Sequence, residues 1–492
     1  MMLVGTGSDV GKSLLMAGLC RVYTRQGLRV SPFKPQNMSN NAAVARDGGE
    51  IGRAQALQAR ACKIPPSVHM NPVLLKPQHN HGAQVVVRGT VTTTTDAQEY
   101  QILKPQLMNT VLESFEELRS HVDLVLIEGA GSAAEINLRH HDIANMGFAS
   151  AVNAPALLVG DIDRGGVIAA IVGVMSVLPE SDRTAIKGFV INRFRGDVSL
   201  FDEGLDFIRE NTGLESLGVV PHFPAAVHLP AEDSLALTTH REDPVGQGSC
   251  VIAVPVLPHI ANFDDLDPLK AEPQITLRFV HSGTPLPGDA DLIVLPGSKA
   301  VMSDLAFLRN EGWDIDLHAH IRRGGFVLGL CGGYQMLGRI IRDPDGIEGL
   351  AGEMSGLGLL DIETVLEGNK VLGVVKGVAV AGGAEVEGYE IHAGRTTGSG
   401  LEYPLLRLGA TANGAVSKDG RIMGSYLHGL FGADGFRQDF LQKLNAGASS
   451  ELGYETQIED TLESLADHLE NTMALDRILE IAGLYRNFAD KH

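Results

Sequence analysis

Short apolar runs alternate with segments of helical spacing along nearly the whole chain of 492 residues. The clearest apolar runs cover residues 122–127, 156–160, 188–191, 250–257, 292–295 and 326–330. Continuous apolar runs of strand length, followed by helical segments, are typical of parallel strands that are buried on both faces. The pattern therefore predicts an α/β fold with two doubly wound, mostly parallel sheets, one in each half of the chain.

Changes in composition divide this pattern into domains. Residues 226–249 are rich in polar residues, proline and glycine, which is typical of a linker. Apolar positions in residues 458–484 have helical spacing only, and they predict a helical appendage. We expect a first domain over 1–225, a linker over 226–249, a second domain over 250–440 and a C-terminal helical segment over 441–492. The first predicted strand is short, and the natural start of the chain is expected upstream of it.

The composition argues against several classes of protein. A formal net charge of −20 argues against a general nucleic-acid-binding protein. The sequence has no apolar run of membrane-spanning length and no cleavable leader, and its 4 cysteines are too scattered for a disulfide framework or a zinc site. We expect a cytoplasmic enzyme with small-molecule substrates and with neither nucleic-acid partners nor membrane insertion.

Residues 5–13 (G-T-G-S-D-V-G-K-S) follow a short apolar run and open a helical segment. In this context they form a variant phosphate-binding loop, with Thr6 where the common pattern has glycine. In such loops the backbone N–H groups cradle phosphate, the lysine reaches the β and γ oxygens, and the hydroxyl binds Mg²⁺. We expect ATP to bind through Gly7, Val10, Gly11, Lys12 and Ser13.

Polar residues stand at the ends of three other strands that the pattern predicts in the first half, namely Glu128, Asp161 and Asn192. The carboxyl ends of parallel strands meet at one edge of a sheet, so these side chains are expected close to the phosphate-binding loop. Ser13 and Glu128 are the predicted oxygen ligands of Mg²⁺. The loop resembles that of the dethiobiotin synthetase group of P-loop ligases, and this resemblance implies an adenine contact for Asn192.

A second motif lies in the other half, where the apolar run Phe326–Leu330 continues into Cys331-Gly332-Gly333-Tyr334-Gln335. A strand, a small-residue turn and a helix around one cysteine form the pattern of a nucleophile elbow, with cysteine in place of serine. Glycine lets the backbone turn sharply, and the helix N-terminus favours the thiolate. A buried core cysteine needs no flanking glycines, so Cys331 is the predicted nucleophile, with its sulfur exposed above the sheet edge.

A thiol nucleophile also needs a proton acceptor and an oxyanion site. His428 closes a later strand-like run and is the predicted base, while the N–H groups of Gly297 and Gly332 are the predicted oxyanion donors. This half resembles the class I (triad-type) glutamine amidotransferase family. The resemblance implies hydrolysis of glutamine to ammonia, with Gln335 in the glutamine-binding site.

That family commonly has a glutamate two residues after the histidine, where this chain has Leu430. We therefore expect a Cys–His dyad in which no acid orients the histidine, and hence a slow glutaminase. If a third member exists, the nearest candidates along the sequence are Glu385, Glu387 and Glu390.

Further motifs extend the resemblance over nearly the whole chain, at residues 36–39, 142–146, 161–166, 262–269, 295–299 and 331–338. In this order they closely resemble the cobyric acid synthase family of cobalamin biosynthesis. The resemblance implies that ATP and glutamine are used to amidate the b, d, e and g carboxylates of a corrinoid acid, adenosylcobyrinic acid a,c-diamide, through acyl phosphates. Candidate substrate residues are Lys34, Gln36, Asn37, Asp142 and Asp161. Cations expected to meet this polyanion are Lys12, Lys34, Arg53, Lys76, Arg139 and Arg164.

Two alternatives stay open at this point. One is a P-loop switch protein with a vestigial glutaminase, although Cys331 and His428 are intact and Gly7 replaces the second lysine of partition-type ATPases. The other is a glutamine-dependent ligase with a different substrate, such as a cobyrinic acid a,c-diamide synthase or a cell-wall precursor amidase. Only a test with a panel of substrates can distinguish this second alternative from the function that the resemblance implies.

Overall fold

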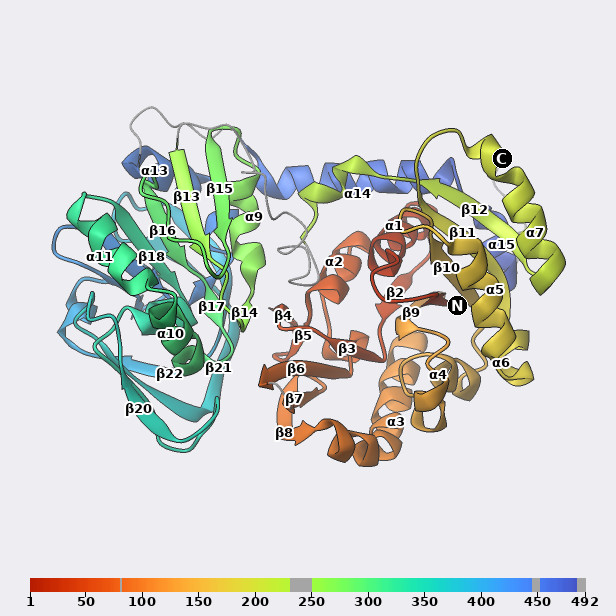
Figure 1. Cartoon of the computed structure of the whole chain (residues 1–492), viewed down its shortest axis with the longest axis horizontal. Helices are drawn as coiled ribbons and strands as arrows, with labels where there is room; N and C mark the ends of the chain where they lie inside the picture. Colours follow the sequence, from red (N-terminus) through yellow and green to blue (C-terminus); the bar gives the residue numbers. More distant parts are fainter. Residues whose placement is uncertain (80–81, 231–249, 445–451, 485–492) are drawn as a thin grey trace.

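The computed structural model describes residues 1–79, 82–230, 250–444 and 452–484, which fold into two α/β halves (Figure 1). The first half contains a fully parallel six-stranded sheet in the order β12-β11-β10-β1-β9-β2. Its strands are β1 (Met2–Gly5), β2 (Val30–Phe33), β9 (Leu124–Ser132), β10 (Ala156–Asp161), β11 (Ile186–Phe194) and β12 (Glu215–Pro221). The predicted doubly wound sheet is confirmed in this half.

Both faces of this sheet are buried because successive side chains of a strand point to opposite sides. Met2 and Val4 belong to one hydrophobic cluster, while Leu3 between them belongs to the other. The first cluster is covered by α3 (Ala97–Arg119), α4 (Met146–Ala151), α5 (Val167–Val177) and α7 (Asp202–Thr212). The second is covered by α1 (Lys12–Arg25), α14 (Tyr454–Glu470) and α15 (Leu475–Ile481). The short helix α6 (Glu180–Ala185) precedes β11.

The C-terminal helices thus return to the first half. The two helices α1 and α14 approach closely at Gly18, where an added Cβ would lie 2.4 Å from Leu469 Cδ1. Arg21, whose side chain is 1% exposed, pairs with Glu459 at 2.8 Å and with Glu463 at 2.7 Å. The sequence predicted that these segments are helical, but only the structure shows that they complete the core of the first half.

A smaller group of elements extends the first half toward the second (Figure 1). Four strands form a sheet, β3 (Gln36–Met38), β6 (Val73–His79), β7 (Gly82–Val87) and β8 (Thr90–Asp96), and two form a hairpin, β4 (Ala42–Val44) and β5 (Glu50–Gly52). The helix α2 (Arg53–Ala61) follows β5 directly. These elements lie between the main sheet and the second half, so they are placed to contact both.

The second half has its own sheet in the order β15-β13-β16-β18-β26-β25, parallel except at β25. Its strands are β13 (Cys250–Pro255), β15 (Ile275–Val280), β16 (Leu292–Leu295), β18 (Phe326–Leu330), β25 (Ala415–Val416) and β26 (Ile422–Ser425). On one face lie α10 (Val301–Asn310), α11 (Trp313–Arg322) and α12 (Gly332–Met336), and on the other lie α9 (Asp267–Lys270) and α13 (Asp434–Leu444). The second predicted sheet is therefore also confirmed.

A long antiparallel hairpin, β21 (Glu363–Ala379) and β22 (Glu385–Thr397), was not predicted. The remaining strands that the structure describes are β14 (Ile260–Ala261), β17 (Gly297–Ser298), β19 (Ile340–Asp343), β20 (Gly352–Ser355), β23 (Leu406–Leu408), β24 (Thr411–Asn413) and β27 (Leu427–His428). Because β27 pairs with β22, with Tyr389 opposite His428, the hairpin brings an aromatic side chain to the predicted base.

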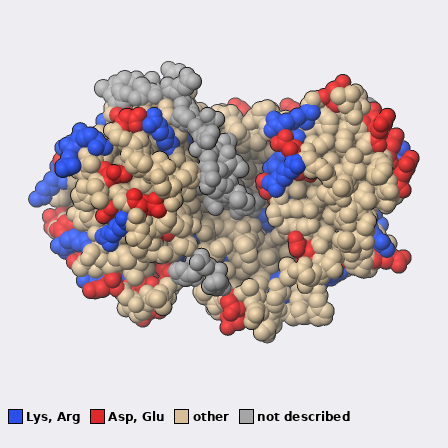
Figure 2. Space-filling model, viewed as in Figure 1, with Lys and Arg blue, Asp and Glu red and all other residues tan. Residues whose placement is uncertain are grey.

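Within the described ranges, no helix combines the length and apolar character needed to cross a bilayer. On the face drawn in Figure 2, Lys and Arg are interspersed with Asp and Glu over both halves. The predicted linker over 226–249 lies mostly outside the described residues, since only residues up to 230 are described, and the domain boundaries stay predictions.

Candidate active sites

The phosphate-binding loop joins β1 to α1 at the carboxyl edge of the first sheet. Gly11 has φ +86°, and an added Cβ would lie 2.2 Å from the Asn192 side-chain nitrogen, so only glycine fits there. Lys12 Nζ donates to the carbonyl oxygens of Gly7 at 3.1 Å and Gly131 at 2.9 Å. The lysine is thus held across the loop at the N-terminus of α1, where backbone N–H groups favour phosphate.

Glu128 is the centre of this site and is only 1% exposed. Its Oε1 accepts hydrogen bonds from Ser13 Oγ at 2.7 Å and from Lys34 Nζ at 2.8 Å. Its Oε2 accepts from Gln58 Nε2 at 2.6 Å. A hydroxyl and a carboxylate oxygen beside a phosphate-binding loop fit the few protein ligands that Mg²⁺ takes when phosphates and waters complete its shell. Gln58 was not predicted as part of this site, because nothing in the local sequence distinguishes it from any other glutamine in a helix.

Other predicted residues of this half make specific structural contacts. Asn192 Nδ2 donates to Val10 O at 2.9 Å, which ties β11 to the phosphate-binding loop. Asp161 is 5% exposed and accepts from Arg193 Nη1 at 2.9 Å. Asp142 accepts three backbone N–H bonds, from Ala144, Asn145 and Gly147 at 2.8–2.9 Å, so it stabilises the turn before α4. The adenine and substrate roles of these residues stay predictions.

The predicted pair Gln36 and Asn37 lies on β3, beside helices α2 and α3. Gln36 Oε1 accepts from Tyr100 OH at 2.7 Å. Asn37 is 3% exposed, and its Nδ2 donates to Gln55 Oε1 at 3.0 Å. The two side chains are therefore held by hydrogen bonds to α3 and α2, and their substrate role also stays a prediction.

The cations predicted to meet a polyanionic substrate have partners within the protein, because five of the six are paired with carboxylates. Lys34 pairs with Glu128, Arg53 with Asp264, Lys76 with Glu50, Arg139 with Asp182, and Arg164 with Asp9 and Asp161. Lys76 has no exposed surface at all. Desolvating a charge is costly unless an opposite charge accompanies it, and the linear sequence does not show these partners.

In the second half, Cys331 lies between β18 and α12 with φ +49° and ψ −107°, a conformation that few non-glycine residues adopt. The glycines allow close packing around this turn: an added Cβ at Gly333 would lie 2.1 Å from Leu295 O, and one at Gly332 would lie 2.8 Å from Ser298 N. The residue is 9% exposed, so the thiol is less accessible than the sequence suggested. It nevertheless lines a cavity, which a nucleophile requires.

The expectation of a dyad with no orienting acid is wrong. His428 Nδ1 lies 2.7 Å from Asp265 Oδ2, and Asp265 Oδ1 accepts from Gly429 N at 2.7 Å. Both side chains are almost fully buried, at 3% and 4% exposed. Cys331 also interacts with His428, because its sulfur raises the pKa of the imidazole, so the three residues form a Cys–His–Asp arrangement.

The three glutamates that the sequence offered as a third member of the site make other contacts. Glu385 and Glu387 are exposed, and Glu387 pairs with Lys376 at 2.8 Å. Glu390 accepts from Asn413 Nδ2 at 2.7 Å. The orienting acid comes instead from η5 (Phe263–Leu266), far earlier in the sequence. The only signal in the sequence was the group of acids Asp264, Asp265 and Asp267 within the motif at residues 262–269.

The surroundings of His428 favour its charged form. Burial alone lowers the pKa of its imidazole, but the Asp265 carboxylate and the Cys331 sulfur outweigh burial and raise this pKa to about 10. The ring of Tyr389 stacks on the imidazole, with centroids 5.2 Å apart and an interplanar angle of 17°. An imidazolium held beside a cysteine sulfur is the partner that a thiolate nucleophile needs.

The cavity at Cys331 has a volume of about 510 Å³ and is lined by both halves of the molecule. Gly332, Ser298, Lys299, Gln335 and His392 come from the second half, and Glu50, Gln84 and Thr90 come from the first. Gln335 is 3% exposed, and its Nε2 donates to Tyr426 OH at 3.1 Å. Gly297 is not among the lining residues, but an added Cβ there would lie 3.5 Å from His428 Cε1. The oxyanion roles of Gly297 and Gly332 stay predictions.

A buried charge cluster closes the side of this cavity that faces the first half. Glu50 is 1% exposed and pairs with Lys76 and, at 2.6 Å, with Lys370. Burial and the neighbouring Lys299 ammonium lower the pKa of Lys370 to about 8, although Glu50 opposes this. The Glu50–Lys370 ion pair therefore joins the two halves at the wall of the cavity that Cys331 also lines.

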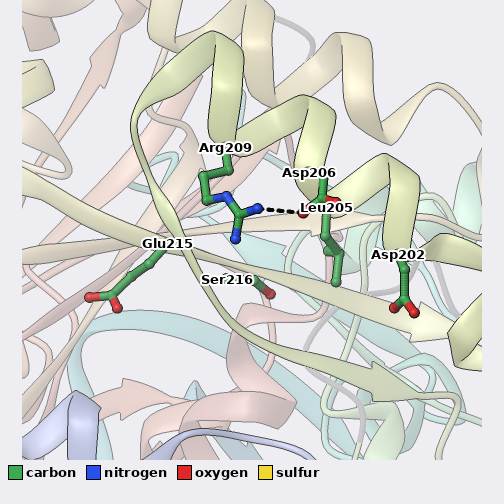
Figure 3. Close-up of a pocket in the computed structure, with 6 residues that line it drawn as sticks. All are labelled: Asp202, Leu205, Asp206, Arg209, Glu215 and Ser216. Carbon is green, nitrogen blue, oxygen red and sulfur yellow. Dashed lines mark hydrogen bonds and ion pairs between the residues drawn. The ribbon is translucent and has the colours of Figure 1, made fainter.

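A second cavity, of about 450 Å³, lies between α7 and β12 (Figure 3). Its lining includes Asp202, Asp206 and Arg209, all exposed, and Arg209 pairs with Asp206 at 2.6 Å. It contains none of the predicted site residues, and we assign no chemistry to it.

Residues 1–236 match a family model described as the CobQ/CobB/MinD/ParA nucleotide binding domain, and residues 251–436 match the CobB/CobQ-like glutamine amidotransferase domain. The chain is 58% identical over 482 residues to a cobyric acid synthase of Methylocella silvestris, covering 98% of this chain and 100% of that protein. A cobyric acid synthase of Granulibacter bethesdensis is 60% identical over 483 residues, with the same coverage. The chain belongs to the cobyric acid synthase family. The relative from Cereibacter sphaeroides, 56% identical over 481 residues, extends this similarity to a third genus.

Membership of the cobyric acid synthase family confirms the resemblance found in the sequence and identifies the two halves. The first is the nucleotide-binding half, and the family implies ATP as its nucleotide. The second is the glutamine amidotransferase half, which contains Cys331 and His428. Their shared cavity therefore lies where an ammonia-producing half meets an ammonia-using half.

Proposed function

We propose that the protein amidates the b, d, e and g carboxylates of adenosylcobyrinic acid a,c-diamide, using one ATP and one glutamine for each, to give adenosylcobyric acid. The family makes the chain a glutamine-dependent amide ligase of cobalamin biosynthesis. The observation that supports the coupled reaction best is the cavity at Cys331, whose wall includes Glu50 and Gln84 of the nucleotide-binding half.

The glutaminase half supplies ammonia. The Cys331 thiolate attacks the carboxamide carbon of glutamine, and the oxyanion that forms is stabilised by N–H donors, for which Gly332 and Gly297 are the candidates. His428, as imidazolium, gives its proton to the leaving nitrogen, so ammonia departs and a thioester remains. The neutral His428 then takes a proton from water, which hydrolyses the thioester to glutamate. Asp265 keeps the imidazole oriented through both steps.

The ligase half activates the acceptor carboxylate. A carboxylate oxygen of the corrinoid attacks the γ-phosphorus of ATP, and ADP leaves, which gives an acyl phosphate. Lys12 and the N-terminus of α1 stabilise charge on the transferring phosphoryl group. Ser13 and Glu128 would hold Mg²⁺, which would neutralise charge on the β and γ oxygens. Ammonia then attacks the acyl carbon, and inorganic phosphate leaves with its bonding electrons and takes up the proton that the nitrogen loses.

The proposal is tested by ATP-dependent glutamine consumption with a panel of corrinoid acids, followed by mass spectrometry of the products. We expect glutamate, ADP and phosphate in equal amounts, and four successive amidations of the a,c-diamide. Turnover of unamidated cobyrinic acid that stops at two amides would instead indicate an a,c-diamide synthase. Consumption of glutamine with no corrinoid product would overturn the proposal.

A further inference from the structure

The helix α2 spans the space between the two sites. It has nine residues, from Arg53 to Ala61. Near its C-terminal end, Gln58 donates to Glu128 at the nucleotide site. At its N-terminal end, the Arg53 side chain reaches the glutaminase half, where Nε lies 2.9 Å from Asp264 Oδ2. One helix of the ligase half therefore contacts both catalytic regions.

Asp264 is the residue directly before the acid that orients His428. Its side chain is 3% exposed, and burial raises the pKa of its carboxyl above the usual value, an effect that the Arg53 guanidinium opposes. Two adjacent buried carboxylates, Asp264 and Asp265, repel each other unless each has its own cation. Arg53 supplies that cation for Asp264, which leaves Asp265 to the imidazolium of His428.

A second set of contacts holds the same loop against the ligase half. Asn262 has φ +53°, and its N–H donates to Asn41 Oδ1 at 2.8 Å. Its side-chain nitrogen donates to Ala42 O at 3.0 Å and to Tyr389 OH at 2.7 Å. The strained backbone of Asn262 is thus secured by groups from the other half of the chain, and the ring that stacks on His428 joins the same network.

We propose that Arg53 of the ligase half is a positioning residue for the glutaminase triad, because its ion pair with Asp264 sets the place and charge of the loop that carries Asp265. The inference deepens the proposed function and rests on it. The glutaminase is complete only when α2 is docked against η5. This arrangement limits the release of ammonia by chains in which the two halves are separated.

The test compares Arg53→Gln, Arg53→Lys and the wild-type enzyme. For Arg53→Gln we expect kcat for glutamine hydrolysis to fall by about tenfold or more while KM for glutamine changes by less than about twofold. Arg53→Lys retains the positive charge and should recover part of that loss. Amidation with ammonium chloride should stay within about twofold of wild type in both variants, because it bypasses the triad.

A matched control is Arg60→Gln, on the same helix, which removes ion pairs with Glu455 and Glu459 instead. It should leave the glutaminase kcat unchanged. Asp264→Asn and the double variant Arg53→Gln/Asp264→Asn complete a double-mutant cycle, and we expect the double variant to be no slower than the slower single variant.

Two outcomes would overturn the inference. One is a wild-type glutaminase kcat in Arg53→Gln, and the other is fully additive losses in the cycle. If Arg53→Gln does not fold, Asp264→Asn alone tests the inference. A wild-type glutaminase kcat in Asp264→Asn would show that the Arg53–Asp264 ion pair is not needed. Absence of glutaminase in the wild-type enzyme would instead contradict the proposed function.

Discussion

Replacing Asp265 by asparagine is the sharpest test of the triad. Both oxygens of this carboxylate accept hydrogen bonds, one from the imidazole of His428 and one from Gly429 N. An asparagine side chain has one acceptor oxygen, so one of these bonds is lost. If the amide NH₂ faces Nδ1, the neutral imidazole must carry its proton on Nε2. Nε2 is the nitrogen that should accept the Cys331 proton, so this tautomer cannot act as the base.

The size of the effect follows from the electrostatics of the pair. The pKa of His428 rises from 6.5 to about 10 in the folded protein, with Asp265 as the largest favourable cause. At about 1.4 kcal/mol per pKa unit, this rise corresponds to roughly 5 kcal/mol as an upper bound, shared with Cys331. The equivalent substitution in a serine triad costs about 10⁴ in kcat, and a thiol depends less on its base than a hydroxyl does. We therefore expect a loss of about 10²–10³ in the glutaminase kcat, or ~3–4 kcal/mol.

The assay measures glutamate formation with ATP and corrinoid present, and ammonium-dependent amidation in parallel. Amidation from ammonium should be unchanged in Asp265→Asn, which shows that the ligase half is intact. Glu387→Gln is the matched control, because Glu387 is an exposed acid on β22 paired with Lys376. A folded Asp265→Asn enzyme with a glutaminase kcat within about threefold of wild type would refute the triad.

Four further predictions follow. Cys331→Ala should abolish glutamine-dependent synthesis and retain ammonium-dependent synthesis, and product from glutamine in this variant would contradict the nucleophile assignment. His428→Ala should lower the rate of glutamine hydrolysis by about 10²-fold or more. Lys12→Ala should abolish synthesis from either nitrogen source, because the acyl phosphate must form first; a near wild-type rate with ammonium would rule out this role of the loop. Glu50→Gln leaves the fully buried Lys76 without its counter-charge, so urea denaturation should show a loss of about 3–5 kcal/mol, and an unchanged midpoint would argue against the buried cluster. Because the folded-state pKa of His428 is raised, its stabilising contribution is complete below pH 6.5 and is lost as the pH rises toward about 10. The difference in unfolding free energy between wild type and Asp265→Asn should therefore shrink over that pH window. A difference that stays constant with pH would exclude this linkage.

The sequence alone was sufficient for features that depend on neighbours along the chain. The phosphate-binding loop and the cysteine elbow both require glycine at particular turns, because a Cβ at Gly11 or Gly333 would collide with nearby atoms. Apolar runs of strand length identified both parallel sheets, because strands buried on two faces must be apolar throughout. These constraints act within a few residues, so they are visible as patterns.

Only the tertiary structure decided which distant residues complete the sites. Asp265 precedes His428 by 163 residues, and it reaches the imidazole because η5 and β27 meet beside β22. Five of the six expected cations proved to be paired with acids, and α14 returned to pack on α1. Such contacts depend on how whole elements pack and on the cost of burying unpaired charge. Neither is encoded in local spacing, so the ligase-to-glutaminase contact at Arg53 emerges only from the folded chain.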